Sequence, residues 1–588
     1  MTQQKRMRSS SVADDGEFLL LCYHRDLQKR AEVYSLSMPS CRSCSAQFEL
    51  LPGEAALHEK ITSTFETGPM DPPGDCPDCR LQRKMAWRNE RHLYHRKCDK
   101  TAKIILSVYP EKTPFPVYER AAWWKDDWDA LEFGRSCDFT RTFFEQFQEL
   151  LNVVPRSALN SVNVENCDYC NFAFDARNCY LAHLCYRSEG MLFCYWMLDC
   201  KDDVDCSFCL KTERCYDCTD CNHSYGCHSC VLSHTCSDCS FLYDCRACTE
   251  CFGCVGLRRK THCMFNEQLT KEEYNKRLTE MDLQNPTHVK AVRDRVLELR
   301  KSHPHLYSIQ DKTENCSGDY IFESKDCHRS YQIYRSQDCM YIQDCETKDA
   351  LHDYHIGWSE LTYESYSSVR QRSTAFCIQC WDGHDMFYSD NCQSCSHCFG
   401  CVRLRHKQYC ILNKQYSKEE YLKLLPKIVA MMKQSDEWGR FFPISMSPFA
   451  YNETMAQQDY PLTESEVKKR GWRWTKESMA TTGKETLKDV PQRIQDVPES
   501  ITKEVLGCTA CKRNYKIIPQ ELALYRQMSI PLPGICPECR YGERLKNRNP
   551  RKLWKRTCGK CGEELETTFS PERSEVIYCE TCYLKTVY

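Results

Sequence analysis

The sequence predicts a mainly β protein with accessory helices, in which cysteine modules at both termini flank a duplicated, cysteine-rich array that resembles a β-solenoid. Three observations lead to this fold class. Cys-x-x-Cys pairs stand near both ends of the 588-residue chain, and the central cysteines follow a three-residue spacing. A segment beginning Cys-Phe-Gly-Cys-Val occurs at Cys251 and again at Cys398, a shift of 147 residues.

The 46 cysteines indicate either a disulfide scaffold or a metal protein. A disulfide scaffold would need a secretory signal, but residues 1–37 offer only a short apolar run, Phe18 to Leu21, without a cleavage site. No segment approaches the roughly 18 apolar residues of a membrane span. We therefore expect a cytoplasmic protein with reduced thiols and no membrane partner. The net charge of −2 means that any nucleic-acid contact must be local.

The terminal modules each contain two Cys-x-x-Cys pairs, which is the ligand pattern of zinc ribbons and treble-clef fingers. Four thiolates suit the tetrahedral geometry of Zn²⁺ and leave no open position for catalysis. The sequence therefore predicts about three structural zinc ions. The predicted ligands are Cys41, Cys44, Cys76, Cys79, Cys508, Cys511, Cys536, Cys539, Cys558, Cys561, Cys579 and Cys582.

A degenerate copy of the last module follows the first zinc site. Aligned with the C-terminal copy, it has Thr101, Glu119 and Ala122 where that copy has cysteines, so Cys98 is not expected to bind metal. We expect packing to hold this module together through three tryptophans: Trp123, Trp124 and Trp128.

The central array has 20 cysteines from Cys167 to Cys263, and each spacing is 3, 6 or 9 residues. A longer period of 21 residues also occurs and suggests a β-solenoid coil of about that length. A polyproline-II-like packing, which also has period 3, is the structural alternative. The second array, from Cys316 to Cys410, has 11 cysteines. Aspartates that precede cysteines suggest recurrent corners: Asp199, Asp205, Asp217, Asp220, Asp238 and Asp244.

Two interpretations of the array cysteines stay open. They can be stacked, inward-facing small hydrophobic side chains, because free cysteine is among the most buried residue types. They can also form a metal ladder of zinc or iron–sulfur groups. The large number and the regularity of the pairs favour packing.

Capping patterns place helices after each array. Thr270-x-x-Glu273 and Ser417-x-x-Glu420 predict helix starts, with helices near 271–283 and 418–434, and a further helix is expected over 286–302. The patterns divide the chain into these segments: an N-terminal extension (1–37), a zinc-ribbon module with a decayed second ribbon (38–135), a connecting helix (136–160), the first array (161–269), a helical spacer (270–305), the second array (306–416), a helix, adaptor and linker (417–507), and tandem zinc ribbons (508–588).

These motifs are similar to those of a known family. The segments CPDCRLQRKMAWRNERHLYHRKCDKT, VYERAAWWKDDWDALEFG, CFGCVGLRRK and PLPGICPECR resemble a cysteine-rich zinc-ribbon family of the ultra-small bacteria of the candidate phyla radiation. The similarity covers nearly the whole chain after about residue 38. It implies a cytoplasmic bacterial protein with terminal ribbons and gives no established activity.

The favoured function is a non-enzymatic zinc protein that binds RNA, DNA or a ribonucleoprotein through basic residues of its ribbon modules. One alternative is a scaffold that docks protein partners on the solenoid surface, and another is metal storage or delivery by the array cysteines. No enzyme is expected, because the histidines are scattered and form no open His/carboxylate set. The predicted nucleic-acid contacts are Arg80, Arg83, Lys84, Arg88, Arg91, Arg540, Arg544, Arg548, Arg551 and Lys555.

Overall fold

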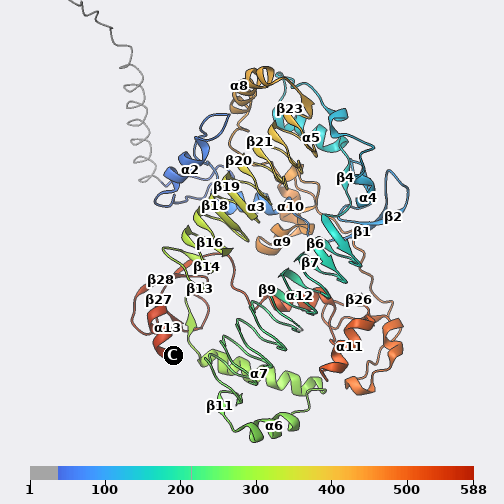
Figure 1. Ribbon diagram of the computed structural model, residues 1–588, viewed down its shortest axis with the longest axis vertical. Coiled ribbons are helices and arrows are strands. Elements are labelled where there is room, and N and C mark those ends of the chain that lie inside the picture. Colours follow the sequence, from blue (N-terminus) through green and yellow to red (C-terminus); the bar gives the residue numbers. More distant parts are fainter. Residues whose placement is uncertain (1–37, 214, 356, 368) are drawn as a thin grey trace, which may run out of the picture.

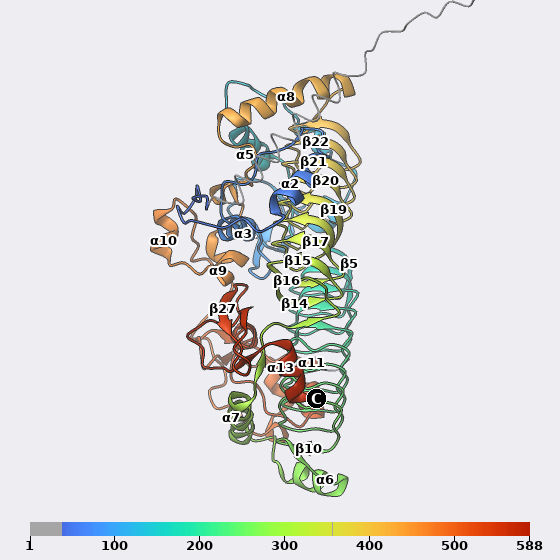
Figure 2. The same cartoon turned by 90° about the vertical axis from the view of Figure 1, so that its left-hand side faces the viewer.

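The computed structural model describes residues 38–213, 215–355, 357–367 and 369–588. Within these ranges the protein is mostly sheet with some helices and has cysteine clusters near both ends, as the sequence predicted. The predicted N-terminal extension lies outside the described residues. The strands stack along the long axis of the molecule, and the terminal modules lie along one side of the stack (Figure 2).

The first array begins with a parallel sheet of five strands in the order β5-β6-β7-β8-β9. Its strands are Ser161–Glu165, Asn171–Arg177, His183–Tyr186, Tyr195–Leu198 and Ser207–Leu210. Isolated parallel bridges continue the pairing down to Phe252↔Met264. Partner residues lie twelve apart in the sequence, as in Asp168↔Tyr180 and Val204↔Tyr216. The expected coil of about 21 residues is therefore wrong, and twelve residues separate stacked positions.

A three-residue backbone pattern explains this spacing. From Asn163 to Phe265, every third described residue has a positive φ, and these positions include all six aspartates that were expected at corners. Asn and Asp tolerate the left-handed conformation better than other non-glycine residues. Apart from Cys215, which follows a residue outside the described ranges, each array cysteine comes directly after such a corner, so the thiols share one register and point into a buried interior.

The second array contains a three-stranded parallel sheet, β13-β14-β16, and a nine-stranded sheet, β15-β17-β18-β19-β20-β21-β22-β23-β24, which is parallel except for its last pair. The first sheet comprises Gln310–Asp311, Gly318–Phe322 and Ser330–Tyr334. The second comprises Lys325–His328, Gln337–Met340, Glu346–Leu351, Gly357–Tyr363, Arg372–Ala375, His384–Phe387, Ser396–Phe399, Gln408–Ile411 and Lys414–Gln415. Pairing is again twelve residues apart over most of its length, with a shorter step and a register shift near Glu346.

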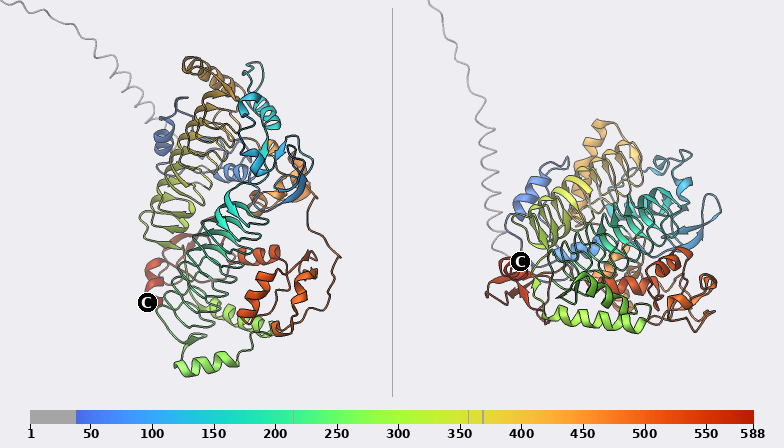
Figure 3. Two further views of the ribbon diagram at one scale, coloured as in Figure 1. Left: turned by 45° about the vertical axis from the view of Figure 1, so that its right-hand side comes forward. Right: turned by 60° about the horizontal axis from the view of Figure 1, so that its bottom comes forward.

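The two arrays run in opposite directions and pack side by side where they overlap (Figures 1 and 3). Aromatic contacts join them: the Phe174 ring lies 5.7 Å from Trp381, and Trp196 stacks on Tyr334 at 6.2 Å. Outer columns carry alternating charge, as in the parallel series Glu165, Arg177, Glu189, Lys201 and Glu213, in which opposite charges face each other across the strands.

Helices cover both far ends of the arrays. Helices α6 (Lys271–Glu280) and α7 (Pro286–Ser302) pack on the last residues of the first array, and α5 (Phe143–Val153) and α8 (Lys418–Gln434) cover the end of the second. The predicted starts at Thr270 and Ser417 are confirmed, because each hydroxyl accepts a hydrogen bond from the backbone N–H three residues on.

Candidate metal centres

The three predicted sets of four cysteines come together in three compact clusters. Within each cluster all four sulfur atoms lie within 4.8 Å of one another. The clusters share one construction. The first Cys-x-x-Cys pair lies at the tip of a small antiparallel pairing: Ser40↔Gln47, β25–β26 (Leu506–Gly507, Asn514–Tyr515) or β27–β28 (Trp554–Thr557, Glu564–Thr567).

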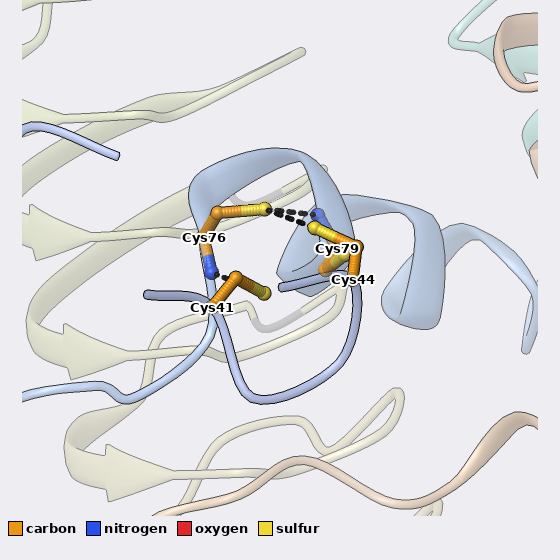
Figure 4. Close-up of side chains that lie close together, drawn as sticks. All are labelled: Cys41, Cys44, Cys76 and Cys79. Carbon is orange, nitrogen blue, oxygen red and sulfur yellow. Dashed lines mark hydrogen bonds between the residues drawn. The ribbon is translucent and has the colours of Figure 1, made fainter. Parts of the chain in front are cut away.

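The second pair opens a helix in every cluster. These helices are α3 (Pro77–Met85), α12 (Pro537–Leu545) and α13 (Glu580–Val587), and the first cysteine of the pair is the N-cap residue. In the N-terminal cluster the backbone N–H of Cys76 donates to Cys41 Sγ at 3.2 Å, and that of Cys79 donates to Cys76 Sγ at 3.5 Å (Figure 4). The helix N-terminus and these N–H groups favour negative charge on sulfur.

The C-terminal clusters repeat the first of these hydrogen bonds. Cys508 Sγ accepts from the N–H of Cys536 at 3.3 Å, and Cys558 Sγ accepts from the N–H of Cys579 at 3.3 Å. Burial opposes ionisation, yet the backbone N–H donors lower the pKa of both Cys508 and Cys558 to about 6. Four sulfurs at this separation, with donors aimed at them, fit a tetrahedral metal ion.

The degenerate copy keeps the fold of the C-terminal module with only one of its four ligand cysteines. Its hairpin, β1–β2 (Tyr94–Lys97, Ile104–Ser107), matches β27–β28, and Cys98 Sγ still accepts from the N–H of Glu119 at 3.1 Å. The Thr101 hydroxyl donates to the Glu119 carboxylate at 3.2 Å, where the intact copy has two cysteines. Trp123 is fully buried against Trp124 and Trp128, whereas Trp124 is partly exposed.

The basic residues after the N-terminal cysteine cluster face the protein interior. Arg80 forms an ion pair with Glu364 of the second array, and both side chains are buried. The Lys84 ammonium donates to the backbone carbonyl of His352, and burial lowers the pKa of Lys84 to about 8. Arg83 pairs with Asp75 at 2.7 Å.

Arg88 and Arg91, further along the same segment, contact other parts of the chain. Arg88 is buried, pairs with Glu90, and lies over the Phe172 ring at 4.3 Å. Arg91 Nη2 lies 2.7 Å from Glu538 Oε1 on α12, and its guanidinium stacks 3.8 Å from the Tyr541 ring. The N-terminal and C-terminal modules therefore contact each other directly.

The basic residues of the C-terminal modules make the same kind of contact. Arg544 Nη1 lies 2.8 Å from Asp205 Oδ1, and Arg540 Nε lies 3.2 Å from the other oxygen of that carboxylate. Arg548 Nε pairs with Asp220 of the first array at 2.9 Å, and its Nη1 donates to Gln332 of the second.

Arg551 pairs with Asp344 of the second array at 2.8 Å. Of the ten predicted nucleic-acid contacts, six are buried, Arg91, Arg548 and Arg551 are half-buried, and Lys555 is exposed. Cations paired with carboxylates in the interior are not available to phosphate groups, and nucleic-acid binding itself stays a prediction.

The array thiols make hydrogen bonds to backbone carbonyls. Cys218 Sγ donates to Tyr216 O at 3.4 Å and lies 3.7 Å from Cys227 O, and the same pattern of residues two before and nine after recurs along the array. Ser224 occupies the same register, and its hydroxyl reaches Asn222 O and Ser233 O at 3.4 and 3.2 Å. Among the described residues, the array cysteines form no compact group of three or more potential ligands. These contacts favour the interpretation in which the array cysteines pack inward and form hydrogen bonds over the interpretation in which they form a metal ladder.

One further ligand group was missed by the sequence reasoning, which found no open His/carboxylate set. His384, Asp385 and His397 each place a ligand atom within 4.8 Å of the other two. Asp385 and His397 are twelve residues apart, so the observed twelve-residue pairing would have predicted that they lie on adjacent strands.

Comparison with known proteins does not place the chain in a family. No known family matches it, and no curated protein does. The chain has a weak likeness to the crystal structure of a protein described as an acetyltransferase from Desulfovibrio desulfuricans G20, with 9% sequence identity and a TM-score of 0.09. The match covers 56% of this chain and 76% of that chain. A likeness at this level carries no argument about fold or activity.

Across the described ranges, none of the helices combines the length and the apolar character needed to cross a bilayer.

Proposed function

We propose that this protein is a non-enzymatic, zinc-dependent scaffold, in which three structural Zn²⁺ ions fix the terminal modules and these modules hold the two arrays in one body. Zinc is the ion of choice because tetrahedral Cys₄ sites select Zn²⁺ or iron–sulfur chemistry, and Zn²⁺ adds no redox reaction. Four protein ligands per ion close the coordination sphere, so the role of these sites is structural.

We also propose that each array is a β-solenoid with a coil of twelve residues. The parallel pairing of residues twelve apart and the left-handed residue at every third position support four corners per coil. Such arrays expose their outer faces along the whole length, which suits a surface for docking protein partners.

The scaffold function rests on one observation: the basic side chains of the terminal modules form ion pairs with the arrays. Arg80 on α3 reaches Glu364 in the second array, while Arg544 on α12 reaches Asp205 in the first. Both helices begin at a metal-ligand cysteine, so the metal sites fix the helices that carry these arginines. We infer that metal binding and array assembly are coupled.

Strand pairing supports the same conclusion. Strand β29 (Ile577–Tyr578), next to the last cysteine pair, pairs in parallel with β12 (His305–Leu306), just before the second array. In the degenerate copy, β3 (Val117–Tyr118) pairs in parallel with β4 (Arg156–Ser157), just before the first array. Each copy of the module therefore joins one array at its start.

The same contacts weaken the nucleic-acid hypothesis, because most of the basic residues that it requires are engaged in contacts within the chain. Retention of the folded protein on immobilised RNA over a salt series tests it. Strong retention that falls steeply with salt would restore nucleic-acid binding as a function.

Removal of metal tests the scaffold proposal. The purified full-length protein is expected to contain about three zinc ions and to lose its compact shape in small-angle scattering when a strong chelator removes them. Readdition of Zn²⁺ restores the shape. A protein that keeps its shape and thermal stability after complete metal removal contradicts the proposal.

A further inference from the structure

A cluster of different chemistry lies on the second array. It consists of His384 and Asp385 on β21 and His397 on β22. Nδ1 of His384 lies 2.9 Å from Oδ2 of Asp385, and Nδ1 of His397 lies 3.8 Å from the same oxygen. We propose that these three side chains form an open binding site for a divalent transition-metal ion such as Zn²⁺.

The backbone brings the ligands together. Asp385 and His397 occupy equivalent corners of consecutive strands, with φ of 53° and 51°, and Tyr409 follows at the next corner with φ of 55°. The His397 ring stacks on Tyr409, with ring centres 4.9 Å apart, and meets the edge of the His384 ring at 5.0 Å. These contacts orient both imidazoles before any ion binds.

A second carboxylate lies beside the ring nitrogen of His397. Nδ1 is buried and lies 2.6 Å from Glu66 Oε1. Phe65 is buried against Phe387 at 5.2 Å and so brings Glu66 to this place. Two carboxylates, those of Asp385 and Glu66, therefore lie within 4 Å of this nitrogen. A cation bound here would coordinate to the lone pair of this nitrogen. The carboxylates of Asp385 and Glu66 would balance its charge.

The donor set defines the class of ion. Two imidazoles and a carboxylate suit Zn²⁺ and similar transition metals, whereas Mg²⁺ and Ca²⁺ prefer oxygen ligands alone. Three protein ligands leave at least one coordination position for water or another small ligand. The His384 side chain is about half exposed (53%), so an ion can enter from solvent. This site therefore differs from the closed Cys₄ clusters and goes beyond the scaffold function.

Metal titration of the full-length protein tests the proposal. Untagged protein is loaded with Zn²⁺ or Co²⁺, freed of excess ion by gel filtration, and analysed for metal per chain. The wild type is expected to hold one equivalent more than the double variant His384→Ala/His397→Ala. With Co²⁺, that equivalent should give visible absorption without sulfur-to-metal charge transfer. Mg²⁺ should not compete for it.

A matched control is His262→Ala. His262 lies 2.8 Å from Glu250 on the first array but has no second histidine in a described ligand group, so this variant should keep the wild-type metal content. Circular dichroism shows that each variant is folded. The comparison measures a difference of one equivalent and does not depend on whether the cysteine clusters hold zinc. Equal metal content in the wild type and the folded double variant overturns the proposal.

Discussion

Arg544 and Asp205, 339 residues apart in the sequence, form an ion pair of 2.8 Å in which both side chains are almost fully buried. One lies on the helix that starts at a cysteine pair of the second cluster, and the other lies at a corner of the first array. Their contact shows how a C-terminal cysteine module is joined to the array.

Loss of this pair should destabilise the protein strongly. Arg544→Met leaves the Asp205 carboxylate buried with Arg540 as its remaining cation, and we expect the free energy of unfolding to fall by about 3 kcal/mol. Chemical denaturation measures the change. The control is Lys546→Met at the C-terminal end of the same helix, where the exposed pair of Lys546 with Glu543 should contribute less than about 1 kcal/mol. Equal effects of the two substitutions would contradict the proposed role of the Arg544–Asp205 pair in joining the module to the array.

Loss of one ligand should release one ion. Cys561→Ser leaves three thiolates in the last cluster, so the zinc content should fall by one equivalent and the C-terminal module should lose its ordered fold. Metal analysis and proteolysis of the C-terminus measure this. Cys137→Ser is the control, because Cys137 is half-buried and lies outside the described clusters, and it should keep the full metal content. Unchanged zinc in Cys561→Ser would count against a Cys₄ site.

Serine should replace an inward thiol at low cost. Cys218→Ser keeps a small donor for the same two carbonyls, as Ser224 does, and we expect a loss on the order of 1 kcal/mol in the free energy of unfolding, with unchanged metal content. Cys218→Leu overfills the interior and should cost more, about 1–3 kcal/mol. The reverse change, Ser224→Cys, should be nearly neutral. Loss of metal in Cys218→Ser would revive the metal-ladder interpretation.

A buried aspartate should make stability depend on pH. Burial raises the pKa of Asp203 to about 7, although Thr212 and the N–H of Cys215 donate to its carboxylate. The folded protein therefore holds a proton on Asp203 that the unfolded chain releases above about pH 4, so stability falls as pH rises towards 7 and this contribution is constant above it.

Asp203→Asn removes this proton equilibrium. Denaturation curves are measured from about pH 5 to about pH 8. Relative to the wild type, the free energy of unfolding of the variant should rise by about 1.4 kcal/mol per pH unit up to about pH 7. Asp238→Asn, at an exposed corner of the same array, should follow the wild-type profile. Parallel profiles of Asp203→Asn and the wild type would show that the carboxyl is not protonated in the fold.

Local signals in the sequence were sufficient to predict several features of the structure. The Cys-x-x-Cys spacing selected the twelve cysteines that cluster, since two such pairs can meet around one ion. The hydroxyl and carboxylate pairs at Thr270 and Ser417 marked helix starts, because capping involves residues three apart. The aspartates before cysteines marked corners for the same reason: a left-handed residue is a local requirement.

The sequence alone determined the cysteine clusters, the capped helices, and the common inward direction of the array thiols, because each depends on neighbours along the chain. The tertiary structure decided the twelve-residue spacing, since a three-residue pattern is compatible with any multiple of three. It also decided the partners of the basic residues, because Arg544 and Asp205 meet only after two distant segments pack together. His384 and His397 came together in the same way, through the pairing of adjacent strands.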